Sequence, residues 1–243
     1  APKPGIVGTM VGRVPTTNTT GLFMIQLTAT DLGKLLARHP RLDDDEPHTP
    51  IQPLPRLGAR LGCHLSVKRD DATLLPFGGN KVRQLRYYLG AALAQGADTV
   101  LITGAVQSNY ARTAAAMAAR AGLRCHVQAE DRVPGGSSHY HQNGNVLLTR
   151  LLGASTSTYP HGEDESGADR ALQDKAADLR RAGATPYVIP LGAAHPPLGA
   201  LGYVEAAIEL AEQCGPKQPL PEVIVVASGS ALTHAGLALG LHV

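Results

Sequence analysis

The sequence predicts an α/β protein built on a parallel sheet with helices on both faces. Short apolar segments alternate with longer segments whose apolar residues recur at helical spacing, as in repeated strand–helix units. The most apolar segment, residues 223–227, shows no polar alternation, which is typical of a strand covered on both faces. The chain has no short-period repeat and no low-complexity tract, so a repeat architecture is excluded.

The first part of the chain is less regular. Residues 1–23 are polar and rich in Thr, Gly and Pro, and we interpret them as an N-terminal extension. Leucines at helical spacing then predict a short helix that ends near Pro40. The acidic run at 43–46 is typical of a solvated loop, with metal binding as a less favoured alternative. Prolines between 47 and 55 indicate an extended segment, and a strand is expected at 64–68.

From Asn80 onward, helices and strands alternate. Glycines at positions 122, 153 and 183 close three of the predicted helices. Helices are predicted after Asn80 and at 110–121, 145–152, 165–181 and 203–213, and strands at 99–103, 125–129, 155–159, 186–191 and 223–227. In open α/β sheets ligands bind at the carboxyl ends of the strands, so the site is expected there.

Composition excludes several kinds of partner. The 243 residues carry 22 basic and 20 acidic side chains, a net charge of +2, so the field that nucleic acid or an anionic membrane requires is lacking. Apolar stretches of about seven residues are far shorter than the ~20 that span a bilayer. Widely spaced cysteines without a CxxC pair, and no secretion signal, predict a cytoplasmic location. No metal is expected, because His139 and His141 lack supporting ligands.

Three strand ends carry polar or glycine-rich residues, and the first is Gly78-Gly79-Asn80-Lys81. Asn80 suits a helix N-cap, and Lys81 then lies in the first helical turn, where the dipole disfavours the ammonium form. Such a lysine suits an amine nucleophile. A glycine turn followed by an exposed lysine is the simpler explanation of the local pattern alone. Of the six lysines, however, only Lys81 follows a turn that lets a ligand approach the backbone closely.

The other two strand ends suit anions. The turn at 107–109 offers side-chain donors and free N–H groups for a carboxylate, although an ordinary N-cap explains it equally well. Residues 228–230, with Thr233 in the next helix, offer hydroxyl and N–H donors for a phosphate. Neither the GxGxxG of dinucleotide folds nor the spacing of a P-loop is present.

Together these features resemble the D-cysteine desulfhydrase and 1-aminocyclopropane-1-carboxylate deaminase family, in the tryptophan-synthase-β-like (fold type II) class of pyridoxal-phosphate enzymes. The matching stretches run in family order from about residue 50 to the C-terminus. Residues 129–134 and 195–199 are also similar to the L-cysteate sulfo-lyase branch. The matching stretches are 67–71, 78–83, 107–109, 143–145, 198–203 and 227–237.

The resemblance implies a domain plan. A small domain at 82–162 would be inserted in a large cofactor domain at 24–81 and 163–243. Both domains would contain open, parallel-type sheets, and C-terminal strands of the large domain would be missing from this chain. Family membership also implies a homodimer.

The resemblance further implies a role for each matching residue. Lys81 would hold pyridoxal 5′-phosphate as a Schiff base and move the α-proton, and Asn80 would hydrogen-bond the cofactor's ring oxygen. Ser108 would also act beside the reacting carbons. The substrate would be bound by Gln107, Ser108, Asn109 and Tyr110. The phosphate would be surrounded by Ser228, Gly229, Ser230 and Thr233.

The implied reaction is β-elimination of a sulfur group from a small cysteine-like amino acid, L-cysteate or D-cysteine, giving pyruvate and ammonia. Three alternatives stay open. The chain is a truncated, catalytically inactive member with weak or no cofactor binding, or it is a 1-aminocyclopropane-1-carboxylate deaminase. The third is an α/β binding protein for another phosphate-bearing ligand, against which the context of Lys81 argues.

Overall fold

The computed structural model describes residues 8–13, 28–43, 47–75, 77–133, 135–162, 164–190, 195–215 and 219–242. The strands are β1 (Gly8–Arg13), β2 (Ile51–Pro53), β3 (Ser66–Lys68), β4 (Thr99–Ala105), β5 (Arg124–Glu130), β6 (Ser155–Tyr159), β7 (Pro186–Ile189) and β8 (Val223–Ser228). The helices are α1 (Ala29–Ala37), α2 (Pro55–Leu61), α3 (Asn80–Ala94), α4 (Asn109–Arg120), α5 (Ser138–Gln142), α6 (Asn145–Leu151), α7 (Glu165–Arg181), α8 (Leu198–Gln213) and α9 (Leu232–Leu241).

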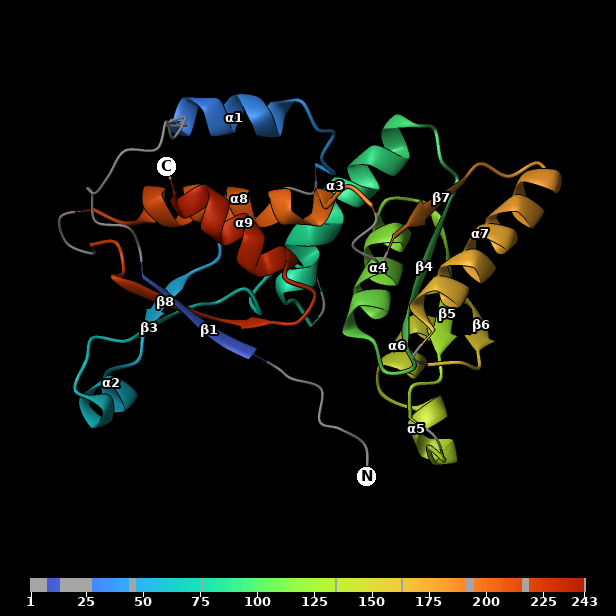
Figure 1. Cartoon of the computed structure of the whole chain (residues 1–243), viewed down its shortest axis with the longest axis horizontal. Helices are drawn as coiled ribbons and strands as arrows, with labels where there is room; N and C mark the ends of the chain where they lie inside the picture. Colours follow the sequence, from blue (N-terminus) through green and yellow to red (C-terminus); the bar gives the residue numbers. More distant parts are fainter. Residues whose placement is uncertain are drawn as a thin grey trace.

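The elements form two groups that lie side by side (Figure 1). One group contains β4 to β7 with helices α4 to α7. The other contains α1, α2, α8 and α9 with the short strands β1, β2, β3 and β8. Helix α3 lies between the groups and packs against both α4 and α8 (Figure 1). The start of α3, where Lys81 lies, is therefore positioned by both groups.

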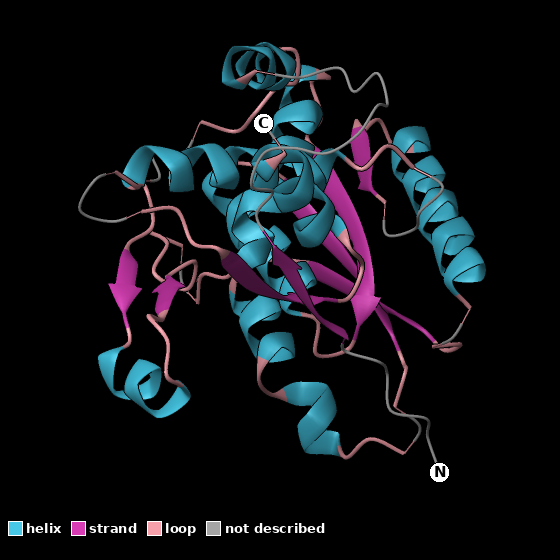
Figure 2. Cartoon of the chain, turned by 60° about the vertical axis from the view of Figure 1, so that its left-hand side comes forward, coloured by secondary structure: helices cyan, strands magenta, loops and turns pink. Residues whose placement is uncertain are grey.

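Strands β6, β5, β4 and β7 form a parallel sheet in that order. Successive side chains of a strand point to opposite faces. Val100 and Ile102 of β4 accordingly lie in the core beneath α3 and α4, whereas Leu101 packs against Leu172 of α7. Helices therefore cover both faces of this sheet, and Figure 2 shows the strands of the protein in the middle of the molecule with helices around them. The predicted α/β class is confirmed.

Small residues allow α3, α8 and α9 to pack closely. A Cβ atom on Gly202 of α8 would lie 2.1 Å from the backbone oxygen of Arg83 in α3. A Cβ atom on Gly236 of α9 would lie 2.2 Å from the backbone oxygen of Ala200 in α8. Because backbone atoms cannot move aside as side chains do, a methyl group at either position would force these helices apart. This packing brings the start of α9 beside the start of α3.

The second predicted parallel sheet does not form among the described residues. Strand β8 pairs with β1 in an antiparallel arrangement, from Gly8 opposite Ser228 to Arg13 opposite Val223. Strands β2 and β3 form a separate antiparallel pair. Part of the segment interpreted as an N-terminal extension thus serves as a sheet strand. A lone β8 would leave unpaired N–H and C=O groups along both edges, and β1 provides partners along one of them.

Other differences concern boundaries and short helices. The proline-rich segment expected to be extended contains β2 but also α2, which begins at Pro55, where proline is well tolerated. The helix expected to end near Pro40 is α1, and part of the acidic run lies outside the described residues. Strand β7 belongs to the same sheet as β4 to β6. We therefore propose that the C-terminal boundary of the small domain lies at about residue 190 and not at 162. No helix in the described ranges combines the length and apolarity needed to cross a membrane.

Candidate active site

A strained turn precedes α3. Residues 77–79 have φ angles of 68°, 39° and 98°, in the region that favours glycine. A Cβ atom on Gly78 would lie 2.3 Å from the backbone oxygen of Asp71, so a larger residue cannot fit there without moving the backbone. The helix N-cap is Gly79, one residue earlier than predicted. Asn80 is therefore the first helical residue, and its side chain is available for contacts outside α3.

Asn80 and Gln84 join α3 to α9 through one hydroxyl group. The Nδ2 atom of Asn80 and the Nε2 atom of Gln84 each donate to Oγ1 of Thr233 at 3.0 Å. Thr233 is 6% exposed. Because its oxygen accepts both bonds, its own hydrogen remains available to donate to a ligand. The sequence interpretation missed Gln84, although its position one helical turn after Asn80 places both on one face.

Lys81 lies between this bridge and the start of α4. Its Nζ atom donates to Oε1 of Gln84 at 3.3 Å and lies 5.4 Å from the ring centroid of Tyr110. Burial lowers the pKa of the Lys81 ammonium below its usual range. A lowered pKa increases the fraction of neutral amine at a given pH, as an amine nucleophile requires.

Tyr110 has a hydroxyl group that no described residue satisfies. The residue is 7% exposed, and its oxygen is buried without a hydrogen-bond partner in the described part of the chain. Burial, together with the nearby Tyr88 and Tyr187, holds the pKa of this phenol well above its usual range. The group is therefore a neutral donor at all moderate pH values. An unpaired buried hydroxyl costs ~1–3 kcal/mol, so a ligand or water there would stabilise the site.

Ser108 and Asn109 lie at the start of α4. Ser108 is the helix N-cap, and its Oγ atom accepts a bond from the backbone N–H of Ala111 at 3.1 Å. Asn109 is exposed, and its backbone oxygen accepts a bond from Thr113. The capping interpretation is therefore correct for Ser108. A carboxylate could still bind at the free N–H groups of this turn. The side-chain amide of Gln107 does not take part in this turn, because it hydrogen-bonds backbone groups of residues 140–145.

The predicted phosphate loop connects β8 to α9. Residues 228–230 form the connection, Ala231 has a φ of 63°, and Thr233 lies in the first turn of α9. The first N–H groups of a helix lack intrahelical partners and attract anions. Leu232 is the first residue of α9. Its Cδ1 atom lies 3.4 Å from the position of a Cβ atom on Gly199, so this side chain packs toward α8.

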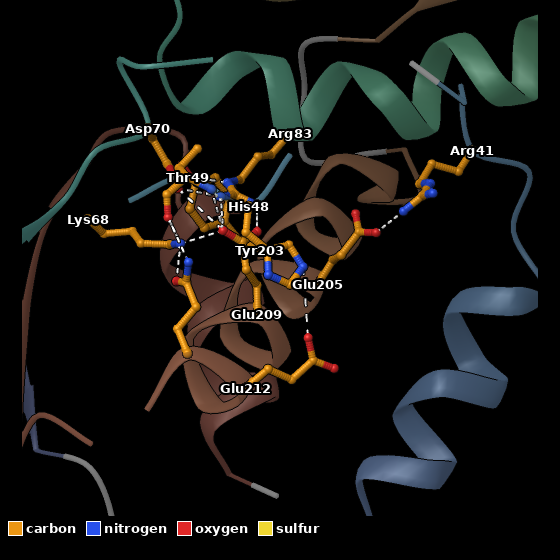
Figure 3. Close-up of polar contacts among 11 residues, drawn as sticks. Arg41, His48, Thr49, Lys68, Asp70, Arg83, Tyr203, Glu205, Glu209 and Glu212 are labelled. Atoms are coloured by element: carbon orange, nitrogen blue, oxygen red, sulfur yellow. Dashed lines mark hydrogen bonds and ion pairs between the residues drawn. The ribbon is translucent and has the colours of Figure 1, made fainter. Parts of the chain in front are cut away.

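A buried network of charges fixes α3 against α8 (Figure 3). Arg83 of α3 binds Glu209 of α8 at 2.7 Å and Asp70 at 3.0 Å. Lys68 also pairs with Glu209, and Tyr203 donates to Asp70 at 2.7 Å. Burial alone would raise the pKa of Glu209, but hydrogen bonds and charge from Arg83 and Lys68 lower it to about 2. Lys68 is thus an ion-pair partner and not a second candidate nucleophile.

The site's donors suit pyridoxal phosphate. An amine of lowered pKa at Lys81 can attach an aldehyde, and the Thr233 hydroxyl and the start of α9 can hold a phosphate. The buried Tyr110 hydroxyl is a further unused donor. In the described ranges no three His, Cys, Asp or Glu side chains are grouped as metal ligands. The residues present therefore fit this cofactor.

Comparison with known proteins leads to the same class. The family model described as "Pyridoxal-phosphate dependent enzyme" matches residues 42–243. The chain belongs to this family, whose cofactor is pyridoxal phosphate.

Individual relatives and one solved structure show which members of the family the chain is similar to. The chain is 44% identical over 207 residues to a D-cysteine desulfhydrase of Klebsiella pneumoniae, covering 85% of this chain and 62% of the relative. It is 44% identical over 212 residues to the Serratia proteamaculans D-cysteine desulfhydrase, covering 87% and 63%. A crystal structure of an ACC deaminase homologue matches with a TM-score of 0.74 and 40% identity, covering 86% of this chain and 61% of that one. The chain thus spans less than two thirds of the length of these proteins.

Proposed function

We propose that this chain carries the lysine, phosphate and carboxylate sites of a pyridoxal-phosphate-dependent lyase. Its substrate would be a small cysteine-like amino acid, D-cysteine or L-cysteate, from which a sulfur group is eliminated to leave pyruvate and ammonia. The observation that carries the proposal is the placement of the Lys81 amine between the Gln84 amide and the Tyr110 ring, after a glycine turn.

The cofactor end of the site would be held by α3 and α9. Thr233 and the N–H groups of 228–230 and the start of α9 would bind the phosphate. Asn80 would orient the Thr233 hydroxyl, to which it donates, and would also reach the ring oxygen of the cofactor. Lys81 would attach the cofactor and carry the proton of the substrate α-carbon. When bound, the pyridoxal group supplies the electron sink for that carbon.

The substrate end would be formed by the start of α4. Ser108 and Asn109 would bind the carboxylate at the positive end of the helix dipole. Tyr110 would close the site beneath Lys81 and exclude water. D-cysteine is supported by the named desulfhydrase relatives, and L-cysteate by the similarity of residues 129–134 and 195–199 to the sulfo-lyase branch.

The test is the visible absorbance of the purified chain with pyridoxal phosphate. We expect a band from the lysine-linked cofactor in the wild type, none in Lys81→Ala, and an unchanged band in Lys175→Ala, which removes an exposed lysine of α7. Pyruvate release from D-cysteine and from L-cysteate would then rank the two substrates. A band that survives Lys81→Ala would contradict the assignment of the lysine, and no band in the wild type would favour the inactive alternative.

A second candidate is deamination of 1-aminocyclopropane-1-carboxylate. The observation that favours it is the ACC deaminase homologue structure, which superposes with a TM-score of 0.74. Its product would be a 2-oxo acid one carbon longer than pyruvate, so the same 2-oxo-acid assay with separation of the products distinguishes the reactions. We also propose a cytoplasmic homodimer, which light scattering of the purified chain would test for its oligomeric part.

A further inference from the structure

The side chain of Gln107 hydrogen-bonds the backbone of α5, of the turn after α5 and of the first residue of α6. Its Nε2 atom donates to the backbone oxygens of Tyr140 at 2.6 Å and Asn143 at 2.9 Å. Its Oε1 atom accepts a bond from the backbone N–H of Asn145 at 3.0 Å. A glutamine amide has two N–H donors, and both are used here. The side chain of Gln107 therefore has no donor left for a substrate carboxylate.

The contact is reciprocal and closely fitted. Asn145 Nδ2 donates to the backbone oxygen of Gln107 at 3.0 Å, and Asn145 Oδ1 accepts a bond from Arg112 Nε of α4 at 3.2 Å. A Cβ atom on Gly144 would lie 2.6 Å from Oε1 of Gln107. Backbone and side chain of both Gln107 and Asn145 thus take part, so a shift of one segment must move the other.

The residues of α5 are only partly covered by the rest of the described chain. None of the residues of α5 is buried, so little apolar burial stabilises it. Gly135 and Gly144, on either side of α5, have φ angles of 74° and 59°. The Gln107 hydrogen bonds therefore act together with the packing of α6 on α4 to hold the segment 138–145 on the protein.

We propose that Gln107 is a positioning residue that couples the substrate turn to the α5–α6 segment. This inference rests on the proposed function, because the turn it positions carries Ser108 and Asn109. Through its amide, Gln107 keeps α5 and α6 against the start of α4 and thereby fixes the N–H groups that would bind the substrate carboxylate.

A cavity lies where the two segments meet. Its volume is about 160 Å³, and its lining includes Ser108 and Ala111 at the start of α4, His141 of α5, Val146 and Thr149 of α6, and residues of β5 and β6. The wall that contains His141 belongs to the segment held by Gln107. Release of that segment would open the cavity and leave Ser108 with solvent on a side that is now covered.

The test uses Gln107→Glu, which keeps the size and the acceptor oxygen but places oxygen against two carbonyl oxygens. The matched control is Gln142→Ala, which removes an exposed glutamine of α5. In the chain without cofactor, we expect hydrogen exchange over 138–146 to be about tenfold to thirtyfold faster in Gln107→Glu, from two lost hydrogen bonds, with β4 unchanged. Gly144→Ala, which crowds the same contact from the other side, should act alike.

In the chain with cofactor, the second readout is the affinity for D-alanine, which has a carboxylate but no leaving group. We expect Gln107→Glu to weaken D-alanine binding about tenfold while cofactor affinity stays at the wild-type value. Lowering the pH should partly restore the affinity, because a protonated glutamate regains one donor.

The outcomes separate the possible roles. Unchanged exchange in both Gln107→Glu and Gly144→Ala would refute the coupling. Faster exchange with unchanged D-alanine affinity would refute positioning of the substrate turn. Loss of D-alanine binding without faster exchange would make Gln107 a direct ligand and overturn the proposal. If the wild type binds no cofactor, the proposed function fails, whereas the exchange measurement still decides the coupling.

Discussion

Glu209 of α8 offers a stringent test of the charge network that positions Lys81. Its carboxylate binds Arg83 through both oxygens, at 2.7 Å and 3.1 Å, and accepts the backbone N–H of Thr49 at 2.8 Å. Arg83 is 3% exposed and Glu209 is 6% exposed. In Glu209→Gln the shape is retained, but the buried guanidinium of Arg83 loses one of its two charged partners, the other being Asp70.

Two arguments give the same magnitude. Breaking a buried ion pair by removal of one partner costs ~3–5 kcal/mol. The same contacts lower the pKa of Glu209 from 4.5 to about 2, and at 1.36 kcal/mol per pKa unit this corresponds to about 3 kcal/mol of stabilisation of the charged form. Because glutamine still accepts the Thr49 N–H, we expect a loss of about 3 kcal/mol in the free energy of unfolding.

The assay is urea unfolding followed by far-ultraviolet circular dichroism at pH 7. The matched control is Glu212→Gln, one helical turn away, where the side chain is exposed and pairs with His48 at 3.8 Å. Exposed pairs contribute ~0–1 kcal/mol, so the control should unfold almost like the wild type. A loss below about 1 kcal/mol in Glu209→Gln, close to the control, would refute the claim that this network stabilises the α3–α8 contact.

The pH dependence gives a second check of the same reasoning. A carboxylate whose folded pKa is lowered stabilises the protein above its unfolded pKa and loses that effect as the pH falls through the folded value. The wild type should therefore lose its advantage over Glu209→Gln between pH 4.5 and about 2. A constant difference across that range would show that Glu209 titrates alike in the folded and unfolded chain.

Three further predictions concern the turns and the thiols. Ala231→Gly should raise the free energy of unfolding, measured in urea, by about 0.5–1 kcal/mol. The φ of 63° strains an alanine, and relief of this strain outweighs the greater chain entropy that glycine loses on folding; a destabilised variant would contradict this. Gly78→Ala should destabilise by at least ~3 kcal/mol and abolish cofactor binding, because its Cβ would meet the Asp71 oxygen at 2.3 Å; wild-type thermal unfolding would show that the turn can relax. Burial raises the pKa of the Cys125 thiol to about 12, so Cys125 should resist a thiol reagent at pH 8 that labels the exposed Cys63; peptide mapping that finds equal labelling would exclude this burial.

The local sequence pattern was sufficient to predict much of the fold and of the candidate site. Apolar strands alternating with helical periodicity predict the parallel sheet of β4 to β7, because these periods reflect the geometry of each element alone. The turns at Lys81, Ser108 and Thr233 stand out for a similar reason: glycine, hydroxyl and amide residues at helix starts carry their chemistry within a few positions of sequence.

Tertiary structure decided the rest. Gln84 contacts Thr233 across 149 residues and Arg83 contacts Glu209 across 126, and neither pair leaves a mark in local periodicity. The direction of the Gln107 amide, toward the backbone of residues 140–145, depends on how α6 packs on α4. The pairing of β1 with β8 depends on which strand edge is left open. Such partners are selected by the packing of whole helices and strands, because a side chain bonds whichever group the fold places within about 3 Å of it.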